Sequence, residues 1–166
     1  AFLSGRTTPA PVRSARPFLE ELEVRQVPAG TPMQVLDINP GAFSSNLYNL
    51  TNVNGVVFFQ ASDGSNGTEL FKSDGTASGT TLLKDINPGV ASSVPMNQFL
   101  FQSKFYFGAD DGVHGRELWQ SNGTAGGTVM LKDLVPGASG GYVGDFTEVR
   151  GTLFFTTSTD GSAKSG

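Results

Sequence analysis

Short apolar runs separated by glycine-rich turns extend along most of this chain, and several of these runs are apolar on both sides. One such run covers residues 56–61. In an extended strand its Val57 and Phe59 fall on one face, and Phe58 falls on the other. The run 104–109 has the same pattern. A sheet with one solvated face would alternate apolar and polar side chains, so these strands are predicted to be covered on both faces.

The pattern recurs every 48 residues. The sequence Asp-Ile-Asn-Pro-Gly begins at Asp37 and again at Asp85 (85 − 37 = 48), and a related sequence begins at Asp133 (133 − 85 = 48). Residues 37–84 laid over residues 85–132 without a gap give 23 identities in 48 positions. Internal repetition with a period of this size is typical of solenoids, propellers or arrays of small units.

Each repeat is predicted to hold four short antiparallel strands. In the first complete repeat these strands are residues 48–53, 56–61, 69–73 and 80–86. Asn54-Gly55 lies between the first two strands and is a strong hairpin signal. Four-stranded units that their neighbours bury on both faces are typical of propeller blades. We therefore expect an all-β fold of tandem four-stranded antiparallel blades, β-propeller-like and incomplete at about 2.5 blades. A linear stack of small sheets is the alternative.

The hairpin between the third and fourth strands allows a prediction of register. If this hairpin is symmetric, its centre follows Thr76, and Glu69 then faces Lys84. By the same reasoning Glu117 faces Lys132. Opposite charges that face each other across strands contribute about 0.2–1 kcal/mol, so such pairs would tune the register without holding the fold together.

The repeats divide the chain into five segments. Residues 1–32 are expected to be disordered or short-helical, with a targeting element among them. The remaining segments are the fourth strand of an incomplete blade with a linker (33–44), two complete blades (45–92 and 93–140) and a truncated third blade (141–166). Propellers typically close with four to eight blades. We therefore expect a longer parent protein or an assembly of chains, with self-association through exposed blade edges.

One motif occurs twice at the predicted third strand. Its structural residues are Glu69, Leu70, Phe71, Asp74, Gly75 and Thr76 in the first repeat, and Glu117, Leu118, Trp119, Gly123 and Thr124 in the second. The motif resembles that of the bacterial ELWxxDGT repeat family, although Phe71 replaces a tryptophan and Asn122 replaces an aspartate. The resemblance covers roughly residues 33–161. It implies an exported bacterial protein, extracellular or at the cell surface, and it implies this location more than any activity.

A second resemblance concerns the N-terminal segment. Residues 19–29 read LEELEVRQVPA and are similar to an LExLExRxxPA stretch near the N-terminus of many large exported proteins. In that setting the stretch implies a targeting element. Taken without the resemblance, the residues predict a short helix that Pro28 ends.

Composition and charge argue against several classes of function. The 166-residue chain has a net charge of −4, and an acidic body repels a phosphate backbone, so nucleic-acid binding is not expected. The chain has no cysteine, which removes disulfides, thiolate metal sites and cysteine nucleophiles. No window approaches the roughly 18 apolar residues of a membrane span.

Candidate catalytic chemistry is sparse. His114 is the only histidine, and Asn66 holds the same position in the preceding repeat, which favours a polar turn residue over a catalytic base. We therefore assign no catalytic and no cofactor-binding residue. Trp119 could offer a stacking platform to a sugar ring, but its position in the middle of a strand favours packing in the core.

Acidic residues in the glycine-rich loops are weak candidates for calcium binding, because hard cations prefer oxygen ligands. These residues are Asp63, Asp110 and Asp111. Neither loop matches the EF-hand pattern. Aspartate also occupies turns because its carboxylate bonds the local backbone, so a structural role is the competing interpretation.

Taken together, these patterns predict a non-enzymatic exported repeat module for surface structure, adhesion or the binding of a ligand or protein. A glycan or a protein surface is the expected class of partner. One alternative is a calcium-dependent binding module. Another is a fragment of a larger propeller enzyme whose active site lies outside this chain.

Overall fold

The computed structural model describes residues 33–158, and within them the chain is all-β without any helix. The described residues from Gln34 onward belong to one compact unit. The helix and targeting element expected in residues 1–32, and the end of the truncated repeat beyond residue 158, lie outside the described residues. The described part of the chain contains no helix that could span a lipid bilayer.

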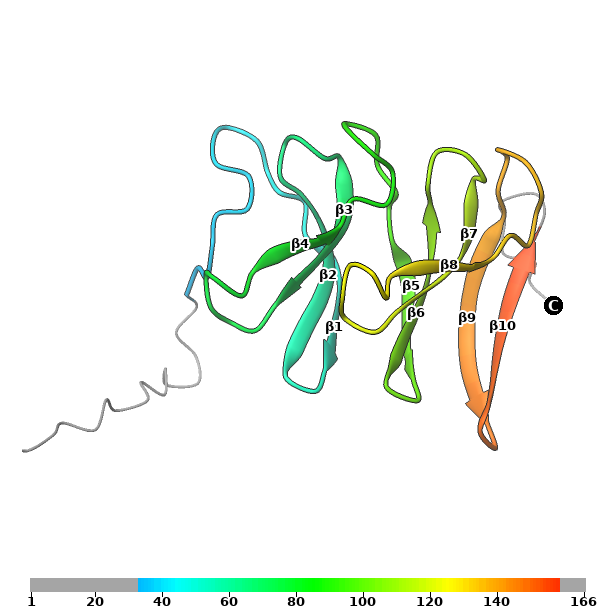
Figure 1. The fold of residues 1–166 in the computed structure, drawn as a ribbon. Coiled ribbons are helices and arrows are strands. Elements are labelled where there is room, and N and C mark those ends of the chain that lie inside the picture. The colour runs from blue at the N-terminus through cyan, green and yellow to red at the C-terminus, as the bar shows by residue number, and fades with distance from the viewer. Residues whose placement is uncertain (1–32, 159–166) are drawn as a thin grey trace, which may run out of the picture. The chain divides into compact units, whose positions relative to one another are not determined.

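The described residues form three antiparallel sheets, which we call blades 1, 2 and 3 (Figure 1). Blade 1 comprises β1 (Tyr48–Val53), β2 (Val56–Ser62), β3 (Thr68–Ser73) and β4 (Thr81–Lys84). Blade 2 comprises β5 (Met96–Phe101), β6 (Lys104–Asp110), β7 (Arg116–Ser121) and β8 (Val129–Lys132). Blade 3 comprises β9 (Tyr142–Val149) and β10 (Thr152–Ser158). Strands that are consecutive in the chain pair within each blade, which confirms the predicted all-β fold of tandem, incomplete blades.

The first hairpin of each blade turns over two residues that both have positive φ. In blade 1 these are Asn54, with φ +51°, and Gly55, with φ +86°. Such dihedrals define a type I′ turn, whose twist matches that of the flanking strands. The same turn is built from Gln102 and Ser103 in blade 2 and from Arg150 and Gly151 in blade 3. The Asn-Gly signal was therefore interpreted correctly, and blade 2 makes the same turn without glycine.

A second repeated feature links the first strands of blades 1 and 2 to the start of the next blade. Asn49 in β1 has φ +55° and Asn97 in β5 has φ +57°, each at a register shift in its strand. Asparagine tolerates this left-handed conformation better than most residues. Asn49 Nδ2 donates to the carbonyl oxygen of Pro95 at 3.4 Å, and Asn97 Nδ2 donates to that of Val143 at 2.8 Å.

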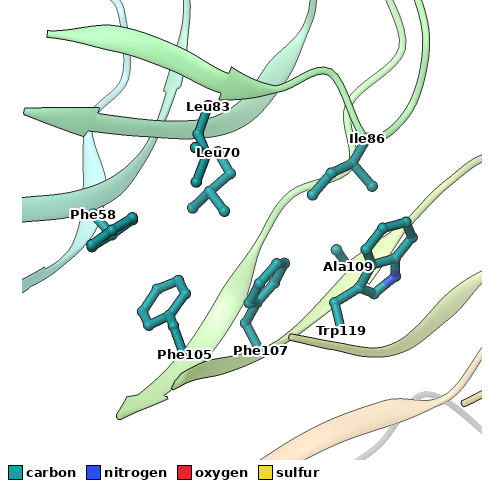
Figure 2. Close-up of a cluster of buried hydrophobic side chains, with 8 residues drawn as sticks. All are labelled: Phe58, Leu70, Leu83, Ile86, Phe105, Phe107, Ala109 and Trp119. Atoms are coloured by element: carbon teal, nitrogen blue, oxygen red, sulfur yellow. The ribbon is translucent and has the colours of Figure 1, made fainter. Parts of the chain in front are cut away.

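Blades 1 and 2 pack face to face through one cluster of buried apolar side chains (Figure 2). Blade 1 and the loop after it contribute Phe58, Leu70, Leu83 and Ile86, and blade 2 contributes Phe105, Phe107, Ala109 and Trp119. The rings of Phe58 and Phe105 lie 5.1 Å apart. Each large side chain buried in this way stabilises the fold by about 1.5–3 kcal/mol. Trp119 is part of this core, as its position within a strand predicted.

The opposite face of blade 1 carries its own apolar cluster. Phe59, Ala61 and Phe71 are buried there, and Ile38, Val57 and Leu82 pack against them. Strand β2 therefore sends Phe58 to one cluster and Phe59 to the other. For β2 this confirms the prediction that the second strand of a repeat is covered on both faces, whereas Phe154, at the position of Phe58 in β10, is 52% exposed.

The predicted register of the third and fourth strands is wrong. Leu70, and not Glu69, pairs with Lys84, and a register shift follows between Leu70 and Phe71. Blade 2 repeats this arrangement, since Leu118, and not Glu117, pairs with Lys132. The hairpin is asymmetric because the turn after β3 has its own hydrogen-bond network and because both glutamates bind backbone donors elsewhere.

Candidate functional site

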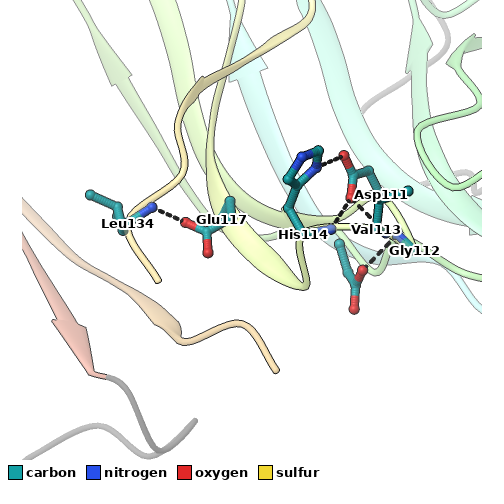
Figure 3. Close-up of polar contacts among 7 residues, drawn as sticks. Asp111, Gly112, Val113, His114, Glu117 and Leu134 are labelled. Carbon is teal, nitrogen blue, oxygen red and sulfur yellow. Dashed lines mark hydrogen bonds and ion pairs between the residues drawn. The ribbon is translucent and has the colours of Figure 1, made fainter. Parts of the chain in front are cut away.

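The loop between β6 and β7 places the only histidine of the chain beside an aspartate (Figure 3). Asp111 Oδ1 accepts hydrogen bonds from the backbone N–H groups of Val113, at 2.9 Å, and His114, at 2.8 Å. Asp111 Oδ2 lies 2.8 Å from His114 Nδ1. In the same loop the N–H of Gly112 donates to Asp110 Oδ1 at 2.7 Å. The carboxylates thus close a tight turn of their own backbone.

This pairing changes the acidity of both partners. The hydrogen bond with Asp111 raises the pKa of His114 above its ordinary value. Burial opposes ionisation of Asp111, but hydrogen bonds from His114 and Val113 outweigh it and lower the pKa of Asp111. Within residues 33–158, no hydrogen bond joins the imidazole to a serine or threonine hydroxyl. Among residues 33–158, the geometry brings together two members of a Ser-His-Asp triad and no third.

Blade 1 builds the same loop without a histidine. Asp63 Oδ1 accepts hydrogen bonds from the backbone N–H groups of Ser65 and Asn66, and Asp63 Oδ2 accepts one from Asn66 Nδ2 at 2.7 Å. The amide of Asn66 therefore makes the contact that the imidazole of His114 makes in blade 2. This equivalence supports the interpretation of His114 as a turn residue.

The calcium candidates lie in these two loops. Asp63 belongs to the blade 1 loop, Asp110 is the last residue of β6, and Asp111 follows it in the blade 2 loop. The structure does not gather three or more histidine, cysteine or acidic side chains into a potential metal site anywhere in its described range. The three carboxylates already accept hydrogen bonds from their own loops. Calcium binding remains a prediction, which a calcium titration would test.

The glutamate of the repeated motif is a buried connector, a role that the sequence analysis missed. Glu69 is fully buried and accepts hydrogen bonds from the N–H of Ile86 at 2.8 Å and from the N–H and hydroxyl of Ser93 at 2.8 and 2.5 Å. Burial raises the pKa of Glu69, and these hydrogen bonds oppose the change. The carboxylate thereby ties β3 to the segment that leads into blade 2.

Blade 2 makes the equivalent connection from Glu117. This side chain is also fully buried, and it accepts a hydrogen bond from the N–H of Leu134 at 2.5 Å (Figure 3). It accepts a second from the N–H of Val135 at 3.2 Å. In both repeats the first donor lies 17 residues after the glutamate. The sequence signal for this contact is a glutamate that recurs at a fixed distance before the Asp-Ile-Asn-Pro-Gly type of turn.

The Asp-Gly-Thr part of the motif forms a self-contained turn. Asp74 Oδ1 accepts hydrogen bonds from the N–H and the hydroxyl of Thr76, at 2.9 and 2.7 Å, and these bonds lower the pKa of Asp74. The hydroxyl of Thr76 in turn accepts one from the N–H of Gly79. A Cβ at Gly79 would lie 2.0 Å from Asp74 Oδ1, so a side chain there would displace the carboxylate that closes the turn.

Blade 2 builds this turn with an amide in place of the carboxylate. Asn122 Oδ1 accepts hydrogen bonds from the N–H and the hydroxyl of Thr124, at 3.1 and 2.7 Å. The turn therefore needs one side-chain oxygen and no negative charge. This explains why asparagine and aspartate both occur at this position of the motif.

A cleft of about 550 Å³ lies between blades 1 and 2. Its polar lining includes Asn54, Lys72, Asp74 and Ser78 from blade 1 and Ser103 and Asn122 from blade 2. Lys72 Nζ donates to the carbonyl oxygen of Gly123 at 3.1 Å, which links the two walls. Lys72, Ser78 and Ser103 were not singled out from the sequence, because the cleft forms between repeats and no single repeat displays it.

The chain was compared with protein-family models, with curated proteins and with solved structures, and none of them matches it. The resemblance to the ELWxxDGT repeat family therefore remains a prediction.

Proposed function

We propose that this chain is a non-enzymatic, exported repeat module for surface structure, adhesion or the binding of a glycan or protein partner. The observation that carries the proposal is that the polar side chains of the repeated loops bind their own backbone. The Asp63, Asp74 and Asp111 carboxylates each accept hydrogen bonds from backbone N–H groups two or three residues further along the chain. Such loops are preformed surfaces, and proton transfer by these groups would break the turns.

The cleft between blades 1 and 2 is the proposed place for a ligand. It combines hydroxyl and amide groups with one cation, Lys72, and one carboxylate, Asp74, above the apolar ring of Phe58. Concave sites with an apolar surface and a few placed polar groups are the usual binding sites for small molecules. A ligand rich in hydroxyl groups, such as a glycan, can both donate to and accept from this set.

A glycan array followed by calorimetric titration of the best binder tests this proposal. Ser78→Trp fills the cleft from its rim and should weaken binding at least about tenfold, which is about 1.4 kcal/mol. The matched control is Ala77→Trp, which adds the same ring one residue away, outside the cleft lining. Equal affinity of the wild type and Ser78→Trp would show that the ligand does not use this cleft.

Calcium and location need separate tests. Calorimetric titration with calcium should give no saturable heat and no melting shift; a saturable signal would support the calcium-dependent alternative instead. The proposed location rests on the resemblance of the motif and of residues 19–29 to exported proteins. Protease treatment of intact producing cells should degrade the protein, and full protection would contradict export to the surface.

A further inference from the structure

Blade 1 has a face that points away from blade 2, which we call the open face. Its residues occupy the same repeat positions as the residues of blade 2 that pack against blade 1. Val57, Phe59, Ala61 and Phe71 of the open face stand 48 positions before Phe105, Phe107, Ala109 and Trp119. In blade 2 these positions pack against Phe58, Leu70, Leu83 and Ile86 of the preceding blade. The open face therefore has the composition of a surface that receives another blade.

Residues just before blade 1 cover part of the open face. Ile38 packs there and stands 48 positions before Ile86, which covers blade 2 in the same way. Val35, 48 positions before Leu83, lines what is left, a groove of about 380 Å³. Leu36, Leu47, Leu50, Val57 and Phe59 also line this groove, so its surface is almost entirely apolar.

The groove lies at the position on blade 1 that corresponds to the binding position of the Phe58 ring on blade 2. A Cβ at Gly123 in blade 2 would lie 3.3 Å from the ring of Phe58. Gly75 is the same position in blade 1 and lines the groove, and a Cβ there would meet nothing within 4 Å. Likewise Phe105, whose ring lies 5.1 Å from that of Phe58, is matched by Val57 in the groove. The space that Phe58 fills on blade 2 is open on blade 1.

Blade 3 carries the matching ring at the other end of the described repeats. Phe154 in β10 stands 96 positions, or two repeats, after Phe58 (154 − 58 = 96), and it is 52% exposed. Exposed apolar side chains are otherwise concentrated at the open-face end, since half of the exposed large hydrophobic residues in the described range fall within 33–50. Concentrated exposure of this kind marks interaction surfaces.

We propose that the open face of blade 1 binds blade 3 of a second copy of this chain, with Phe154 of that copy seated in the groove. The contact continues the interface between blades 1 and 2 and is head-to-tail, because it joins different surfaces of the two copies. The inference does not depend on which ligand the cleft or the loops bind.

Sedimentation velocity of the 166-residue chain from about 1 to 100 μM tests this proposal. The wild type should associate reversibly as its concentration rises. Leu50→Lys places a charge in the groove, and Phe154→Lys replaces the ring that binds there with a charge. Each should weaken association at least about tenfold. The matched control is Val90→Lys, at a site that is 86% exposed and outside both surfaces; it should associate like the wild type.

Mixing the two variants tests whether the groove of one copy binds Phe154 of another. Leu50→Lys keeps a normal Phe154, and Phe154→Lys keeps a normal groove, so an equal mixture should recover dimers although neither variant associates alone. A monomeric wild type, unchanged association of Phe154→Lys, or a mixture without dimers would overturn the proposal. Circular dichroism and melting curves identify a misfolded variant, and Phe154→Ala, a milder change at an exposed site, then replaces Phe154→Lys with the same expected result.

Discussion

The buried glutamates of blades 1 and 2 occupy the same repeat position and share one backbone donor, 17 residues further along, but their other donors differ. Glu69 accepts three hydrogen bonds, two of them from Ser93. Glu117 accepts two, both from backbone N–H groups, and the position of Ser93 is held by Gly141, which has no hydroxyl. The comparison teaches that the repeat needs a carboxylate bonded to the segment leading to the next blade, while the donors themselves can change.

Replacing Glu69 by leucine should lower the free energy of unfolding more than any other substitution proposed below. The change leaves three buried donors without an acceptor, and we expect the free energy of unfolding to fall by about 3–5 kcal/mol. Glu117→Leu leaves two donors unpaired and should cost about 2–4 kcal/mol. Urea unfolding at neutral pH followed by circular dichroism measures both. Glu69→Gln, which keeps one acceptor oxygen, is the control and should lose less; a greater loss for Glu117→Leu than for Glu69→Leu would contradict the account.

The turns around Asp74 and Asn122 offer a second test, with a smaller expected effect. Asn122→Ala removes the acceptor of the Thr124 N–H and hydroxyl and should lower the free energy of unfolding by about 1–2 kcal/mol. Asn122→Asp restores the residue that blade 1 uses and should change it by less than about 0.5 kcal/mol. Thermal unfolding compares the two variants. If they were equally destabilised, the amide and not the oxygen would be the required group.

Much of the fold could be predicted because its signals are local. The end of β1 follows from the Asn54-Gly55 turn beside it, and the two-faced strands follow from short runs that are apolar on both sides. The turn formed by Asp111 and His114 is equally local. These features need no knowledge of distant contacts, so the sequence pattern was sufficient for them.

The remaining features depend on contacts between repeats. The predicted pair of Glu69 with Lys84 relied on a symmetric hairpin, whereas the donors that bind Glu69 lie 17 and 24 residues further along the chain. The register shift after Leu70 is likewise invisible in a pattern of alternating residues. The cleft could not be predicted for the same reason, because Lys72 and Asn122 line it from different repeats.

The type I′ turns allow an exchange between blades with an expected effect of about 0.5–1 kcal/mol. Ser103 adopts φ +61° in blade 2, where blade 1 has Gly55. Ser103→Gly should raise the free energy of unfolding by relieving this strain, and Gly55→Ser should lower it by a similar amount. A Cβ at Gly55 would meet nothing within 4 Å, so the backbone conformation alone is tested. Urea unfolding gives both values, and effects of the same sign would refute the interpretation.

The smallest expected effect is a difference in the pH dependence of stability between the loop of blade 2, which contains His114, and the loop of blade 1, which does not. The hydrogen bond with Asp111 raises the pKa of His114 above its ordinary value of 6.5. The folded chain then binds the proton more tightly than the unfolded chain does. The contribution of His114 to stability is therefore fully present below pH 6.5 and is lost as the pH rises through the folded pKa.

His114→Asn gives blade 2 the residue that blade 1 has at this position and should remove this contribution. Between about pH 6 and pH 8, the range in which histidine titrates, the melting temperature of the wild type should fall relative to that of His114→Asn. Glu69, whose pKa burial raises, also favours the folded state less as the pH rises, but it is present in both proteins and cancels in the difference. Melting curves that stay parallel across this range would show that the imidazole acts only as a neutral partner of Asp111, as the amide of Asn66 does for Asp63.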